Sequence, residues 1–112
     1  MSHPPRPLIE YDDRWLLPFR GLTVISIQVD SALTLNLTNE AAVQIGGVAT
    51  LGWVNAGVRP ERVELDLGKP DVAAELVGTK VLSAVAFKSG GLRLVFDSGR
   101  VLRVKPGVSV TW

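Results

Sequence analysis

Apolar and polar residues alternate along most of the chain after Gly21, and this period of two constrains the fold more than any other feature. In "LTLNL" (33–37) every second residue is a leucine, and "AVQI" (42–45) continues the pattern. Such alternation is typical of antiparallel strands that have one face in the core and one in water. We therefore expect three strands between residues 23 and 45. Later stretches predict three more, near 79–87, 92–96 and 100–105, and "VSVTW" (108–112) alternates again.

The two sets of predicted strands also match each other. "GLTVISIQV" from Gly21 aligns with "GTKVLSAVA" from Gly78, and "LTLNLTNEAAVQI" from Leu33 aligns without a gap with "LRLVFDSGRVLRV" from Leu92. The leading glycine and the turn lengths agree as well as the apolar positions. We predict a repeated three-stranded meander, over about 21–45 and 78–105, whose two apolar faces pack together.

One segment predicts a helix, "KPDVAAELVG", in which proline suits the first helical position and Gly78 follows the last turn. The expected fold class is therefore α+β, mostly antiparallel: two repeated three-stranded meanders forming a sandwich or half-open barrel, with one short helix at about 70–77. We expect residues 1–20 to form an N-terminal arm and docking segment. Residues 21–112 then form a single β-rich domain.

Composition excludes several kinds of chemistry. The chain has no cysteine, so thiol catalysis, disulfides and thiolate metal sites are excluded, and His3 is the single histidine. Twelve Lys and Arg against eleven Asp and Glu leave a net charge of +1, which argues against nucleic acid and membrane partners. We expect no catalytic, cofactor-binding or metal-binding residues and no enzymatic activity. A signal-peptide run and a membrane-spanning run are both missing from the pattern, which predicts a cytoplasmic protein.

The segment "LRLVFDSGRVLRV" predicts a hairpin with a definite register. A three-residue turn at 97–99 keeps Leu92 and Leu94 on the inner face, with Gly99 in the left-handed position. The same register places Arg93 directly opposite Arg103 on the outer face. Like charges that face each other across two strands cost up to about 1 kcal/mol unless something compensates them.

Three interpretations of the arginine pair remain open. In the first, solvent screens the charges or a carboxylate such as Glu75 or Asp66 neutralises them. In the second, an acidic protein or a second subunit binds there. In the third, the pair binds a phosphate or a nucleic acid. The first repeat carries neutral Thr34 and Gln44 at the equivalent positions. The charge is therefore specific to the second repeat.

The motif "SAVAF" followed by "GLRLVFDSGRVLRVKP" (83–106), with "ISIQVDSALTLNL" (25–37) before it, resembles a family of small actinobacterial proteins of unknown function. The resemblance implies a β-rich fold and no catalytic residues. Small proteins of this type sometimes act as immunity factors for toxins, which implies a protein partner.

The leading functional hypothesis is a non-catalytic protein-binding or assembly module that binds itself, as a homodimer or larger oligomer, or another protein. The alternatives are an immunity-type inhibitor of a toxin and a small enzyme or ligand-binding barrel that uses Asp30, Glu64 or Asp66. The candidate partner-binding residues are basic residues of the second repeat and aromatic residues near the two ends: Arg93, Arg103, Lys105, Tyr11, Trp15 and Trp112.

Overall fold

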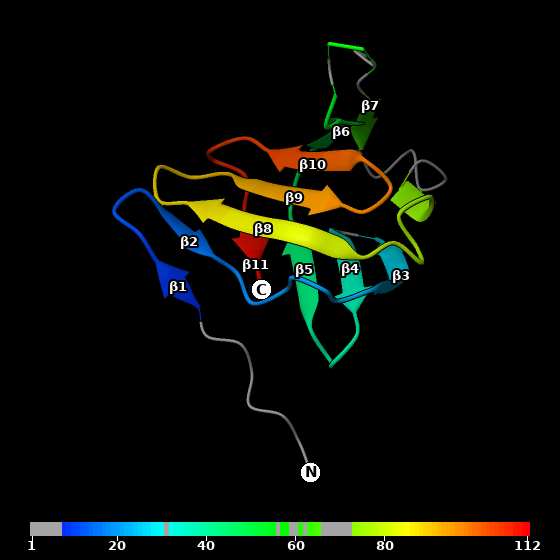
Figure 1. Ribbon diagram of the computed structural model, residues 1–112, viewed down its shortest axis with the longest axis horizontal. Coiled ribbons are helices and arrows are strands. Elements are labelled where there is room, and N and C mark those ends of the chain that lie inside the picture. The colour runs from blue at the N-terminus through cyan, green and yellow to red at the C-terminus, as the bar shows by residue number, and fades with distance from the viewer. Residues whose placement is uncertain (1–7, 31, 56, 59–60, 62, 66–72) are drawn as a thin grey trace.

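Strand pairing organises the chain into two antiparallel sheets in the computed structural model, which describes residues 8–30, 32–55, 57–58, 61, 63–65 and 73–112 (Figure 1). The larger sheet has seven strands in the spatial order β1 (Ile9–Glu10), β2 (Arg14–Leu16), β8 (Val81–Phe87), β9 (Leu92–Phe96), β10 (Arg100–Val104), β6 (Ala49–Trp53) and β7 (Val63–Leu65). The smaller sheet has four strands in the order β11 (Val110–Thr111), β5 (Ala42–Ile45), β4 (Leu33–Leu37) and β3 (Val24–Val29).

The core lies between the inner faces of the two sheets. β4 and β9 show the same alternation, in which the first, third and fifth residues are buried and the residues between them are partly exposed. Burying a leucine or phenylalanine side chain stabilises a fold by about 1.5–3 kcal/mol, so these two strands anchor the structure. The largest fully buried side chains are Phe96, Leu35, Leu37, Ile45, Leu51, Leu76, Leu92, Leu94, Leu102, Val24 and Val43.

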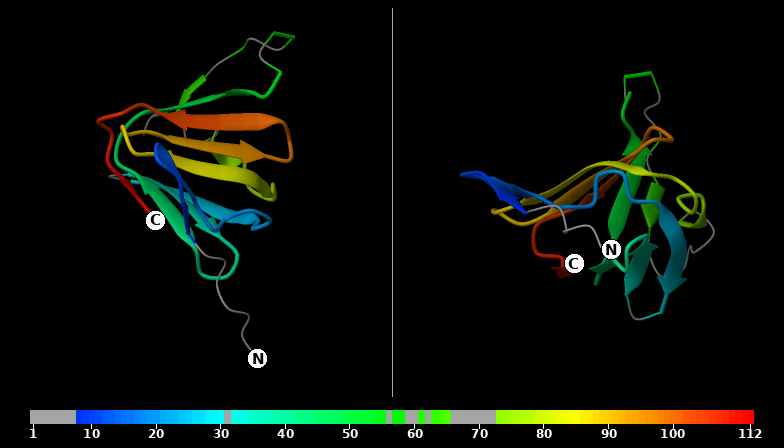
Figure 2. Two further views of the ribbon diagram at one scale, coloured as in Figure 1. Left: turned by 60° about the vertical axis from the view of Figure 1, so that its left-hand side comes forward. Right: turned by 60° about the horizontal axis from the view of Figure 1, so that its bottom comes forward.

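The two sheets meet at one corner and are not closed into a barrel. An antiparallel bridge joins Thr23, just before β3, to Lys80, just before β8. The strands of the larger sheet run across those of the smaller sheet in Figure 1, and Figure 2 shows the two sheets as separate layers. This crossed arrangement is one of the two usual ways in which sheets pack face to face.

The strand that follows each meander in the chain belongs to the other sheet. After β5 the chain leaves the smaller sheet, and β6 pairs with β10 of the larger one. After β10 it crosses back, and β11 pairs with β5. The layers are therefore tied together by the chain itself as well as by the core.

The prediction of a mostly antiparallel β structure is confirmed, but the helical part of the α+β prediction is not, because the described residues are nearly without helix. Helical backbone covers only residues 73–74, and turns follow to Gly78. Ala73 and Leu76 are buried and anchor this turn, and Gly78 ends it with a φ of +89°. The first part of the predicted helix, residues 70–72, lies outside the described residues.

The predicted hairpin register is confirmed. Leu94 pairs with Leu102, and Arg93 pairs with Arg103. The three residues between β9 and β10 form the turn, with Gly99 at a φ of +90°. A side chain is strained at such a φ, so turn chemistry and alternation select the same register.

Candidate functional site: a groove on the outer face of the larger sheet

Strand register lines up one row of residues across the outer face of the larger sheet. Val85 of β8 pairs with Arg93, Arg93 with Arg103, and Arg103 with Thr50 of β6. A groove of about 520 Å³ crosses this row. We call it the outer groove. That volume lies within the range of about 300–1,000 Å³ that is typical of ligand sites.

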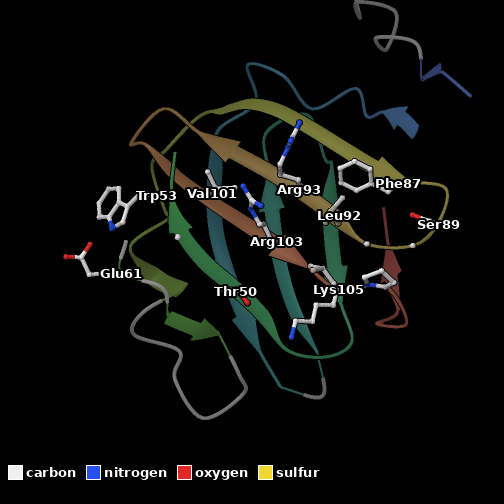
Figure 3. Close-up of a pocket in the computed structure, with 15 residues that line it drawn as sticks. Thr50, Trp53, Glu61, Phe87, Ser89, Leu92, Arg93, Val101, Arg103 and Lys105 are labelled. Carbon is white, nitrogen blue, oxygen red and sulfur yellow. The ribbon is translucent and has the colours of Figure 1, made fainter. Parts of the chain in front are cut away.

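Two cations lie side by side in the middle of the outer groove. Arg93 and Arg103 are directly opposed on neighbouring strands, which places their Cα atoms about 4.5–5.5 Å apart. Figure 3 shows both between Trp53 at one end of the groove and Phe87 at the other. A third cation, Lys105, follows β10 and lines the same groove.

No described acidic residue makes an ion pair with any of these three cations. The salt bridges among the described residues join Asp13 to Arg14, Glu10 to Lys88, and Glu75 to Arg100. Glu61 is the one acid among the described residues that line the groove. The outer groove thus carries an excess of positive charge although the whole chain is nearly neutral.

Arg93 is the more constrained of the two arginines. Its Cζ lies 5.9 Å from the ring centroid of Phe87, which is a cation–π distance. Its Nε is buried and has no hydrogen-bond partner among the described residues. A buried donor without a partner costs about 1–3 kcal/mol, so an acceptor at this point would be stabilising.

Stacked side chains build the two ends of the groove. The Cζ of Arg100 lies 3.8 Å from the ring centroid of Trp53, and its Nε forms an ion pair with Oε1 of Glu75 at 2.7 Å. Glu75 therefore pairs with Arg100 and not with Arg93 or Arg103. At the other end, the Cζ of Arg14 lies 5.8 Å from the ring centroid of Phe87.

The floor between the ends is apolar. Val101 of β10 is only 4% exposed although it lies on the outer face, opposite Val95. Pro106 adds apolar surface to the lining. A ligand in this groove meets cations beside an apolar floor, which is the chemistry of a site for an anionic group attached to an apolar one.

The structure separates the predicted partner-binding residues into two groups. Arg93, Arg103 and Lys105 line the outer groove together. Tyr11 is 52% exposed in the turn between β1 and β2, and Trp112 is 48% exposed after β11, in the smaller sheet.

Trp15 belongs to neither group. It packs against the core as a partly buried residue, and the Nζ of Lys88 lies 5.3 Å from its ring centroid. Trp15 therefore packs from β2 against the core.

Of the acidic residues of the enzyme alternative, the two that the structure describes belong to different sheets. Asp30 follows β3 of the smaller sheet, Glu64 lies in β7 at the edge of the larger sheet, and Asp66 lies outside the described residues. Across the part of the chain that the structure describes, no three potential metal-ligating side chains cluster. Among the described carboxyls, the Arg14 guanidinium holds the pKa of Asp13 below its usual value.

Sequence reasoning missed three of the groove residues, namely Trp53, Phe87 and Val101. Trp53 comes from β6, whose pairing with β10 spans about 50 residues of chain, so no local signal marks it. Val101 could have been found, because the confirmed register places it on the same face as Arg103. Phe87 could also have been found from its two-residue spacing from Val85.

The comparisons with known proteins give a family and no activity. The model of a family of unknown function (DUF6188) matches residues 15–112, which include every strand of both sheets except β1 and the first residue of β2. No curated protein and no solved structure shows a significant match. No helix within the described residues has the length and apolar character needed to cross a membrane.

Proposed function

The chain belongs to the DUF6188 family of unknown function, and since this membership assigns no activity, we propose from the outer groove that it is a non-catalytic module that binds an acidic segment of a protein. The ligand is an extended stretch with at least one carboxylate beside an apolar or aromatic side chain. The carboxylate lies between Arg93 and Arg103, and its apolar neighbour lies on Val101.

The opposed arginine pair is the observation that carries this proposal. The two guanidinium groups repel each other, and the Nε of Arg93 has no described partner. A carboxylate relieves both costs, because it accepts charge-assisted hydrogen bonds from guanidinium groups. A neutral acceptor such as an amide oxygen could satisfy the Nε of Arg93 but leaves the repulsion between the two charges, and a basic ligand relieves neither cost.

The groove favours a protein segment over a nucleic acid. Single-stranded nucleic acids are held by basic channels with aromatic rings whose faces are open for base stacking. Here Arg100 covers a face of Trp53, and Arg14 and Arg93 lie over Phe87. The near-neutral charge of the chain also provides little long-range attraction for phosphates.

We further propose that the domain consists of two copies of one unit, with the outer groove as a specialisation of the second. Paired hydrogen bonds at the junction of the sheets support this. The Gly21 N–H donates to the Val81 carbonyl at 2.7 Å, and the Gly78 N–H donates to the Val24 carbonyl at 2.8 Å. Both glycines have a φ close to +90°.

Side chains repeat the same correspondence. The Thr23 N–H donates to Oγ1 of Thr38 at 3.1 Å, and the Lys80 N–H donates to Oδ1 of Asp97 at 3.0 Å. Irregular pairing also falls at matching places, directly after Val24 in β3 and directly after Val81 in β8.

If the two units are copies, the smaller sheet shows which residues this fold accepts at the positions of the arginine pair. Thr34 pairs with Gln44 in the smaller sheet at the positions that Arg93 and Arg103 occupy in the larger one. The double substitution Arg93→Thr/Arg103→Gln therefore installs a pair that this fold already accommodates. It removes the charge from the groove while the strands keep suitable residues.

Binding of a fluorescent peptide tests the function. The probe is a short peptide that alternates aspartate with tyrosine or leucine, and the control peptide carries asparagine in place of aspartate. We expect the acidic peptide to bind, and the Arg93→Thr/Arg103→Gln variant to weaken its binding by about tenfold or more. Affinity should fall as salt rises, because screening weakens the charge contacts.

Lys80→Gln provides the matched control. Lys80 is exposed, lies outside the groove, and its substitution removes a positive charge while the arginine pair stays. We expect this variant to bind as tightly as the unchanged protein. Equal loss in both variants, or equal affinity for the aspartate and asparagine peptides, would contradict the proposal.

A further inference from the structure

We propose that the occupant of the outer groove is the β1–β2 turn of a second copy of this chain, so that two copies exchange turns in a symmetric dimer. This inference rests on the proposed function and names the partner of that site. We call Tyr11–Asp13 the acidic turn.

The acidic turn carries the chemistry that the groove requires. A Tyr11 N–H to Arg14 carbonyl hydrogen bond of 2.8 Å closes it into a narrow loop between β1 and β2. Tyr11 is 52% exposed, and Asp12 is exposed and makes no ion pair with any described residue. An unpaired carboxylate thus stands next to an exposed aromatic ring.

Asp12 is the carboxylate available for a partner. Its neighbour Asp13 is already bound on both oxygens by Arg14, at 3.0 and 2.9 Å. The same contact lowers the pKa of Asp13, so that residue stays ionised and engaged within its own chain.

Apolar residues beside the acidic turn add contact area. Leu8 is 49% exposed and Ile9 of β1 is 44% exposed, which is unusual for consecutive large aliphatic residues on a monomer. β1 is also an edge strand of the larger sheet. A second copy whose groove receives the turn covers these residues as well.

The placement of turn and groove suits a closed dimer. The Lys88 N–H donates to the Asp13 carbonyl at 2.9 Å, and Phe87 next to it lines the groove. The β1–β2 and β8–β9 turns lie at the same end of the larger sheet in Figure 1. Because turn and groove adjoin, one two-fold axis brings each turn to the other copy's groove, and the contact is self-complementary.

Mixing two variants tests the exchange. The groove variant, Arg93→Thr/Arg103→Gln, keeps its turn, and the turn variant, Tyr11→Ser/Asp12→Asn, keeps its groove. Both sets of substitutions lie outside the core, and far-ultraviolet circular dichroism checks that each variant folds.

Sedimentation equilibrium at concentrations up to about 1 mM measures the mass. We expect the unchanged chain to approach twice its 12.0 kDa with rising concentration, and each variant alone to stay near 12.0 kDa. An equimolar mixture should regain dimers, more weakly than the unchanged chain, because one of the two turn–groove contacts is intact.

Two results would overturn the inference. One is an unchanged chain that stays at 12.0 kDa throughout, and the other is a mixture that sediments like the separate variants. If the unchanged chain nevertheless binds the aspartate peptide through Arg93 and Arg103, the proposed function stands and only the second copy is rejected. If the peptide also fails to bind, both proposals are rejected.

Discussion

Replacing the opposed arginines with the Thr34–Gln44 pair of the smaller sheet should stabilise the isolated chain. In Arg93→Thr/Arg103→Gln, the repulsion across the two strands disappears, which is worth up to about 1 kcal/mol. The buried Nε of Arg93 disappears with it, and an unsatisfied donor of this kind costs about 1–3 kcal/mol. Both changes favour the folded state.

Losses offset part of this gain. The contact of Arg93 with the Phe87 ring is removed, which costs about 0.5–1 kcal/mol. Thr and Gln also have shorter aliphatic stems than the arginines, so less apolar contact area remains on this face. The expected net effect is a rise of about 1 kcal/mol in the free energy of unfolding, with the repulsion near 1 kcal/mol and the buried donor at the lower end of its range.

The corresponding thermal shift follows from chain length. An unfolding entropy of about 2.1 cal/mol/K per residue over 112 residues is about 235 cal/mol/K, so 1 kcal/mol raises Tm by about 4 °C. Urea unfolding followed by circular dichroism, at low micromolar concentration, measures the free energy of the monomer. Thermal unfolding under the same conditions measures Tm.

The reciprocal change is the control. Thr34→Arg/Gln44→Arg installs opposed arginines in the smaller sheet, at the equivalent register, and should lower the free energy of unfolding by up to about 1 kcal/mol. A loss of more than about 1.5 kcal/mol in Arg93→Thr/Arg103→Gln would refute the reasoning. It would mean that the arginines already make strong contacts within their own chain.

Three further predictions concern the frame of the groove. Gly91→Ala should lower the free energy of unfolding, measured in urea, by more than about 1 kcal/mol, because φ is +97° and the new Cβ would lie 2.8 Å from the Val104 carbonyl oxygen. Gly57→Ala is the control. No atom lies within 4 Å of a Cβ added there, so the free energy of unfolding should change little. Glu75→Gln should lower the free energy of unfolding by less than about 1 kcal/mol, because the ion pair of Glu75 with Arg100 is partly exposed. It should still alter tryptophan fluorescence, because Arg100 stacks on Trp53. An unchanged spectrum would argue against that stack. Asp13→Asn should destabilise the chain at neutral pH and lose its effect as the pH falls through the lowered pKa of Asp13, because a carboxyl whose pKa is depressed by folding stabilises only while ionised. Urea unfolding over a series of acidic pH values measures this, and a difference from the unchanged chain that does not shrink as the pH falls would contradict it.

Local pattern was enough to predict the strands and the register of the second hairpin. The alternation in "LRLVF" and the three residues before Arg100 determine which side chains of the hairpin face the core, because a shift of one residue would reverse every one of them. The outward arginine pair followed from that register alone. A groove around the pair did not, since its ends come from Trp53 and Phe87, on strands that flank the hairpin.

The predicted helix is longer than the observed helical backbone, and packing between distant residues is again the reason. Proline, acidic residues and Gly78 predict a helix over 70–77, yet helical backbone in the described part covers only 73–74. Isolated helices this short gain little from propensity, so packing decides them. Here two buried side chains, Ala73 and Leu76, suffice to hold a turn.

The sequence by itself determined the antiparallel strands, their inner and outer faces, and the opposed charges of Arg93 and Arg103, because alternation and turn length act over a few residues. Only the tertiary structure decided which strands that lie far apart in the chain become neighbours. It placed β6 beside β10, paired Glu75 with Arg100, and left Arg93 and Arg103 without a described acidic partner. Such pairings join residues far apart in the chain, and their free energy depends on how two whole sheets pack, which no local pattern encodes.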